Sequence, residues 1–85
     1  MVSDRVEITF VPGEGAVLRM LGLIERRGFA VRGIAMTENS SSGSIAMDVE
    51  ARDPLRRLDV LSRQLERLTE VRSVTISHQQ AGTPA

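Results

Sequence analysis

The segment from Gly15 to Met36 constrains the fold of this chain most, because it combines a helix, a stop signal and a strand. Val17, Leu21 and Ile24 recur at i, i+4 and i+7, the spacing that puts apolar side chains on one helix face. Gly28 follows, and glycine ends a helix easily because it adopts the left-handed conformation without a Cβ clash. After it the apolar period shortens to that of a strand. The segment therefore predicts a helix and then a strand.

Four segments alternate apolar and polar residues with the period of a half-buried strand. They are residues 5–11, 29–37, 44–51 and 70–77. The small polar residues 38–43 predict a hairpin loop between the second and third of these strands. We expect residues 1–4 to be a lead-in without regular structure, and the residues from His78 onward to be a frayed tail.

A second helix is predicted to begin at Asp53-Pro54. Aspartate accepts hydrogen bonds from free amide groups at a helix start, and proline fits the first helical position. The apolar face of this helix consists of leucines, namely Leu55, Leu58, Leu61, Leu65 and Leu68. This stripe is too short for a stable coiled coil, so we expect it to pack on the sheet of its own chain.

The element order β-α-β-β-α-β predicts an α+β, ferredoxin-like fold. Its four-stranded antiparallel sheet would carry both helices on one face, with the first and third strands inside. A chain of 85 residues has room for one core, so we expect a single domain over residues 1–78 and a disordered tail over residues 79–85. The predicted core comprises Val6, Ile8, Phe10, Val17, Leu21, Ile24, Phe29, Val31, Ile45, Met47, Val49, Leu58, Leu61, Leu65, Val74 and Ile76.

The second strand is expected to be an association surface. Alternation places Ala30, Ile34 and Met36 on the helix-free face of the sheet, which makes this edge strand apolar on both faces. Two copies would then pair edge to edge, or a partner would dock on the open face. The alternative is that a few exposed aliphatic side chains are ordinary. The predicted interface residues are Phe29, Ala30, Val31, Arg32, Ile34 and Met36.

Composition argues against several functions. The 11 basic and 11 acidic residues leave no net charge, which disfavours nucleic acid and anionic membranes as partners. Without cysteine there is no disulfide, thiolate nucleophile or thiolate metal site, and the one histidine, His78, has no companion ligand or base. The turn at residues 12–15 lacks the Gly-Lys-Ser/Thr ending of a phosphate loop. We expect no catalytic residue and no metal, and the missing signal peptide and membrane span predict a cytoplasmic protein.

Two stretches carry a family resemblance. The first, Gly15-Ala-x-x-Arg-x-x-Gly-Leu-Ile-x-x-Arg-Gly28-Phe-x-Val, resembles an ACT domain. It is more narrowly similar to the small regulatory subunit of bacterial acetolactate synthase (acetohydroxyacid synthase). The second, Gln64-Leu-x-x-Leu-x-x-Val71-x-x-Val, resembles the second helix and last strand of that subunit. The match spans about residues 5–77 and is closest to the short, single-domain type of subunit.

The resemblance implies a non-catalytic partner in the biosynthesis of valine, leucine and isoleucine. In that family the large subunit holds thiamine diphosphate, magnesium and FAD and condenses pyruvate with a second 2-oxoacid, so this chain itself needs no cofactor. The small subunit raises activity and in many members confers inhibition by valine. ACT domains pair through the second strand, and an amino-acid effector sits between the first loop and helix of one chain and the second strand of the other.

The chain departs from the effector-binding pattern of that family at two positions. Pro12 and Ala30 stand where the family has asparagines, and both replacements remove amide groups that would hold the polar ends of an amino acid. We therefore expect weak valine binding or none. The residues of the degenerate effector site would be Gly13, Glu14, Gly15, Ala16 and Ala30. The alternative function is a free-standing ACT amino-acid sensor that regulates another enzyme or a transcription system.

Overall fold

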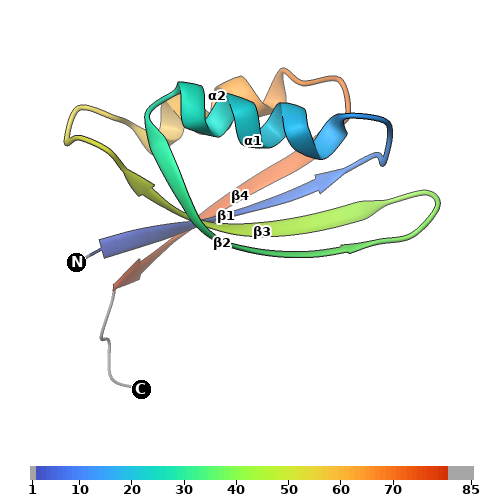
Figure 1. Ribbon diagram of the computed structural model, residues 1–85, viewed down its shortest axis with the longest axis horizontal. Coiled ribbons are helices and arrows are strands. Elements are labelled where there is room, and N and C mark those ends of the chain that lie inside the picture. The colour runs from blue at the N-terminus through green and yellow to red at the C-terminus, as the bar shows by residue number, and fades with distance from the viewer. Residues whose placement is uncertain (1, 81–85) are drawn as a thin grey trace.

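The computed structural model describes residues 2–80, and side chains over residues 4–77. Its six elements follow the predicted order (Figure 1). They are β1 (Val2–Phe10), α1 (Ala16–Arg26), β2 (Phe29–Glu38), β3 (Gly43–Ala51), α2 (Leu58–Glu66) and β4 (Val71–Gln80). The helix that ends before Gly28, the strand that follows it and the hairpin after β2 are all confirmed.

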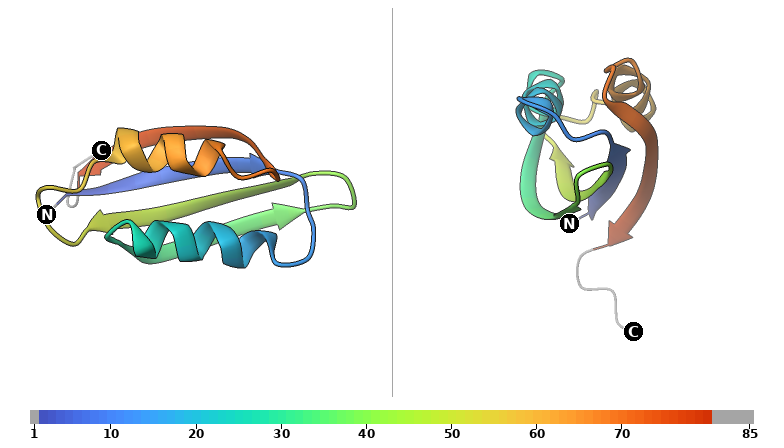
Figure 2. Two further views of the ribbon diagram at one scale, coloured as in Figure 1. Left: turned by 90° about the horizontal axis from the view of Figure 1, so that it is seen from above. Right: turned by 90° about the vertical axis from the view of Figure 1, so that its right-hand side faces the viewer.

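The four strands form one antiparallel sheet in the order β2-β3-β1-β4. This order confirms that the first and third strands are internal and that β2 and β4 are the edges. Both helices lie side by side on one face of the sheet, and the other face carries no helix (Figure 2). The ferredoxin-like fold is therefore as predicted, and it leaves one face and two strand edges of the described chain open.

The hydrophobic core lies between the sheet and the two helices, and most of it was predicted correctly. Its buried residues are Val6, Ile8, Phe10, Ala16, Met20, Leu23, Ile24, Phe29, Ile45, Met47, Val49, Leu61 and Leu65. Six predicted core residues pack against this core but are only partly buried, namely Val17, Leu21, Val31, Leu58, Val74 and Ile76. The prediction for α1 was also wrong in detail, because Ala16, Met20 and Leu23 are buried in place of Val17 and Leu21. The reason is that α1 packs against α2 as well as β2, which turns its buried face toward the space between them.

The first and last strands of the chain, β1 and β4, are longer than their apolar patterns. β1 begins at Val2, so the predicted lead-in was wrong, and β4 continues to Gln80, beyond the predicted end at Ser77. The two extensions pair with each other, with Val2 opposite Gln80. Backbone hydrogen bonds sustain this pairing whatever the side-chain pattern, so periodicity did not reveal it. The remainder of the predicted tail, residues 81–85, lies outside the described residues.

The start of α2 was also predicted wrongly. Asp53 does accept a hydrogen bond, from the backbone N–H of Leu55 at 2.8 Å, but this bond closes only a turn. The backbone of Arg57 is extended (φ −118°, ψ 129°), and α2 begins after it at Leu58. Leu55 consequently stands outside the leucine stripe and is 85% exposed. The same aspartate chemistry serves turns and helix starts alike, so the sequence alone did not separate them.

Candidate functional site

The loop between β1 and α1 contains three of the five predicted effector-site residues, and a fourth, Ala16, is the first residue of α1. Gly15 lies at the helix start with φ 77°, and α1 has no side-chain cap there. The carbonyl of Gly13 accepts the N–H of Ala16 at 3.1 Å, which closes the turn. Ala16 is buried, so only Gly13, Glu14 and Gly15 face outward. The loop therefore offers backbone groups to a ligand and few side-chain groups.

An ion pair fastens this loop to the segment between α2 and β4. The Nε of Arg19 donates to Oε2 of Glu70 at 2.6 Å, and an Nη of Arg19 donates to the carbonyl of Glu14 at 3.1 Å. The N–H of Val11 also donates to the carbonyl of Glu70 at 2.7 Å. A surface hollow of about 520 Å³ lies beside this contact, lined by Val11, Pro12, Gly13, Arg19, Thr69 and Glu70. The hollow is thus lined by the guanidinium of Arg19, the carboxylate of Glu70 and the apolar side chains of Val11 and Pro12.

The exposed edge of the sheet is β2, and a β-bulge changes which way its side chains point. Val31 pairs with Val49, but the next paired residue is Gly33, opposite Asp48, so Arg32 is the extra residue. Beyond the bulge the alternation is reversed, because two residues of β2 oppose one of β3. Ile34 and Met36 therefore pair with Met47 and Ile45 and share their helix-facing side.

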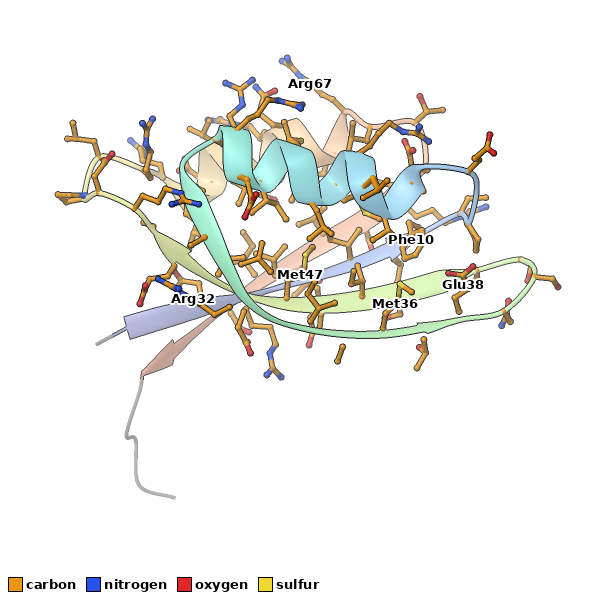
Figure 3. The ribbon with its side chains drawn as sticks, viewed as in Figure 1. Phe10, Arg32, Met36, Glu38, Met47 and Arg67 are labelled. Carbon is orange, nitrogen blue, oxygen red and sulfur yellow. The ribbon has the colours of Figure 1, made fainter. Side chains whose placement is uncertain are left out.

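This bulge corrects the predicted position of two interface residues. Ile34 and Met36 do not point to the helix-free face, and Figure 3 shows Met36 on the same side of the sheet as Met47. Both side chains are nevertheless 52% and 46% exposed, respectively, because nothing in the described chain covers the outer side of an edge strand. We call Ile34 and Met36 the β2 edge patch. The exposed apolar side chains were therefore predicted correctly, but they lie on the helix-facing side of the edge strand β2 and not on the helix-free face of the sheet.

Charged side chains of β1, β2 and β3 form ion pairs between neighbouring strands. Nε of Arg5 lies 3.1 Å from Oδ1 of Asp48, and an Nη of Arg32 lies 3.0 Å from Oε1 of Glu50. Each of these arginines thus has a carboxylate partner on a neighbouring strand. Within the part of the chain that the structure describes, no three potential metal ligands of the His, Cys, Asp and Glu type gather.

The sequence pattern of a known family matches most of this fold. The pattern is that of the ACT domain, and it matches residues 12–74, from the β1–α1 loop to the first residues of β4. The chain belongs to the ACT domain family. ACT domains are regulatory, non-catalytic domains that sense amino acids.

Solved structures of low sequence identity share the fold of this ACT domain. The ACT domain from GTP pyrophosphokinase of Chlorobium tepidum superposes with a TM-score of 0.74 at 15% identity, over 88% of this chain and 96% of that one. An ACT domain protein from Streptococcus pneumoniae gives 0.67 at 16% identity, over 92% and 88%. The C-terminal domain of the MgtC protein from Mycobacterium tuberculosis gives 0.68 at 15% identity, over 100% and 95%. Among proteins of curated function, none matches this chain.

The predicted effector residues of this ACT domain do not all meet within one chain. The loop residues lie at the N-terminal end of α1, whereas Ala30 lies near the start of β2, beyond the other end of α1 (Figure 1). Ala30 pairs with Glu50 and is partly buried. Phe29, a predicted interface residue, is buried in the core, so only its backbone is available at the edge.

No helix among residues 2–80 is both long and apolar enough to cross a bilayer.

The ion pair at the loop predicts a pH-dependent contribution to stability. The hydrogen bond from its own backbone N–H, and next the guanidinium of Arg19, hold the pKa of the Glu70 carboxyl below its usual value. A carboxyl whose pKa is lower in the folded state stabilises the fold above its unfolded pKa of about 4.3, and this stabilisation disappears as the pH falls through the folded pKa. We expect Glu70→Gln to unfold at lower urea concentration than the wild type at neutral pH.

The difference between the two proteins should shrink in acid, below about pH 4, where the wild-type carboxyl becomes protonated. Glu66→Gln is the matched control, because Glu66 is exposed and forms no ion pair among the described residues. Stability is measured by urea unfolding followed with circular dichroism. If Glu70→Gln is as stable as the wild type at neutral pH, the ion pair between Arg19 and Glu70 contributes nothing to the stability of the fold.

Proposed function

We propose that this ACT domain is the regulatory small subunit of an acetolactate synthase. It forms a homodimer through β2 and activates the catalytic large subunit by binding to it. The narrower resemblance of residues 15–31 and 64–74 to that subunit supports the choice of enzyme. Thiamine diphosphate, magnesium and FAD would belong to the large subunit, and this chain would supply no catalytic group.

The observation that carries the dimer is the free edge of β2. Within residues 2–80, β2 pairs only with β3, so the N–H and C=O groups along its other edge have no strand partner. An unpaired edge flanked by exposed apolar side chains favours addition of another strand. The β2 edge patch lies beside that edge, and a second copy would cover both. Partly buried Val17 and Leu21 on α1 would extend the apolar contact between the helix layers.

Weak sensitivity to valine follows from the chemistry of the loop. A bound amino acid presents an ammonium and a carboxylate, and buried charges need hydrogen-bonding partners. Pro12 has neither a side-chain amide nor a backbone N–H, and Ala30 has only a methyl group. The polar side chains nearest to the loop, Arg19 and Glu70, already bind each other. We therefore propose activation of the enzyme with little inhibition by valine.

Reconstitution with a purified catalytic subunit tests this function. We expect the chain to co-purify with the acetolactate synthase large subunit and to raise its rate of acetolactate formation. Added valine should change that rate little, because the loop lacks the amide groups described above. The catalytic subunit alone, with and without valine, is the control. No binding and no rise in activity would contradict the proposed function, and strong valine inhibition would contradict the account of the loop.

The alternative function, a free-standing amino-acid sensor, is favoured by one feature. The hollow beside the loop places a guanidinium and a carboxylate next to the apolar Val11 and Pro12, which matches the groups of an amino acid. Calorimetric titration with a panel of amino acids distinguishes the two functions. Tight binding of one amino acid, together with no affinity for the catalytic subunit, would favour the sensor.

A further inference from the structure

We propose that the outer surface of the helix layer docks an acidic segment of the catalytic subunit. We call Arg26, Arg27 and Arg67 the interhelix arginines, and they would bind the carboxylates of that segment. The identity of the partner rests on the proposed function, whereas the surface and its chemistry rest on the side chains described below.

Among the described side chains, residues 4–77, the interhelix arginines have no carboxylate partner. All acidic residues of the sequence lie between Asp4 and Glu70, which is within the described side chains. No ion pair joins any of them to Arg26 or Arg67, and Arg27 donates only to the amide oxygen of Gln64, at 3.2 Å. Other arginines of the helix layer are paired, such as Arg19 and Arg57. The three unpaired guanidinium groups are therefore available to a partner.

These three arginines belong to one surface that spans both helices. Arg27, at the end of α1, reaches across to Gln64 on α2. Arg67 lies three residues after Gln64, and residues three apart are neighbours on one side of a helix. Figure 3 shows Arg67 on the outer side of the helix layer, away from the sheet. The side chain of Arg26 lies back along α1, because its Nη1 is 3.5 Å from the position that a Cβ on Gly22 would take.

Nearby carboxylates do not neutralise this surface. Asp59 receives hydrogen bonds from Nε and Nη2 of Arg57, both at 3.0 Å, and lies 3.8 Å from Arg63. These contacts hold the pKa of the Asp59 carboxyl below its usual value, chiefly through the hydrogen bond from Arg57, so it stays ionised and paired. Glu70 is bound by Arg19. Neither of these two carboxylates is therefore bound to an interhelix arginine, and among the described residues Glu25 pairs with Arg52 instead of Arg26 or Arg27.

The pattern of charges favours a short acidic protein segment over a nucleic acid. The guanidinium fork binds a carboxylate with two parallel hydrogen bonds, and arginine is enriched where proteins meet. Exposed Glu25 and Glu66 lie on the same two helices and would repel a continuous phosphate backbone. A protein segment carries its carboxylates only at certain residues, so these can reach the arginines without lying next to Glu25 and Glu66. Arg27 also reaches away from the β2 edge, toward α2, so docking here is compatible with a dimer through β2.

Charge reversal at one of these arginines tests the docking surface. We expect Arg67→Glu to weaken binding to the catalytic subunit by about tenfold or more, and Arg26→Glu together with Arg67→Glu to weaken it further. Arg72→Glu is the matched control, since Arg72 is exposed and forms no ion pair among the described residues, and it should stay within about twofold of the wild type. Affinity is measured by titration calorimetry, with circular dichroism to verify folding.

Each outcome of this experiment has a definite meaning. Equal affinity of Arg67→Glu and the wild type for the catalytic subunit would overturn the docking surface and leave the proposed function intact. A wild-type chain that does not bind the catalytic subunit would overturn the proposed function and the partner named here together. Binding of the wild type, but not Arg67→Glu, to a duplex DNA fragment at the same salt concentration would show a nucleic-acid surface instead.

Discussion

If the chain forms the proposed dimer through β2, aspartate in place of both Ile34 and Met36 is expected to convert it into monomers. These side chains are half exposed in the single chain, and edge-to-edge pairing of β2 would bury both against the second copy. Each replacement removes apolar burial and places a carboxylate in the contact, on both sides of a twofold interface. We expect the dissociation constant of the dimer to rise by about 100-fold or more.

Size-exclusion chromatography with light scattering measures this change directly. Leu55→Asp is the matched control, because Leu55 makes the same apolar-to-acid change at a site that is 85% exposed on the segment between β3 and α2. The control should remain dimeric. A double variant that still elutes as a dimer at the concentration of the wild type would place the interface elsewhere. Within the proposed function, the monomeric variant should also activate the catalytic subunit less.

Alanine at Gly43 is expected to cost the fold about 1–3 kcal/mol of unfolding free energy. Gly43 pairs with Phe10 at the start of β3, and the phenyl ring lies directly over its backbone. A Cβ at Gly43 would stand 2.5 Å from Cζ of Phe10 and 2.8 Å from its Cε1. The ring is 1% exposed and enclosed by the core, so it has little room to move away.

Urea unfolding of three variants isolates this contact. Gly13→Ala is the matched control, since a Cβ there meets nothing within 4 Å, and its stability should stay within about 0.5 kcal/mol of the wild type. Phe10→Leu together with Gly43→Ala should cost less than the sum of the single changes, because the shorter side chain relieves the overlap. A Gly43→Ala variant as stable as the wild type would show that the ring moves freely.

The candidate site was only partly visible in the sequence. Gly13, Glu14 and Gly15 are consecutive in the loop and Ala16 begins α1, so the proximity of these four residues was predictable. The ion pair between Arg19 and Glu70 was not predicted, because the two residues lie 51 positions apart and neither belongs to an apolar pattern. The unpaired state of Arg26 and Arg67 was equally hidden, since a charged residue shows its partner only after the chain has folded.

The order and type of the elements were determined by the sequence itself. Apolar period and chain connectivity are local properties, and right-handed crossovers leave few ways to arrange them. The side of the sheet to which Ile34 and Met36 point was decided only by tertiary structure. The extra residue at Arg32 depends on how β2 aligns with β3, and a shift of one residue reverses every side chain beyond it. Strand alignment is a property of two segments together, so the pattern of one segment does not contain it.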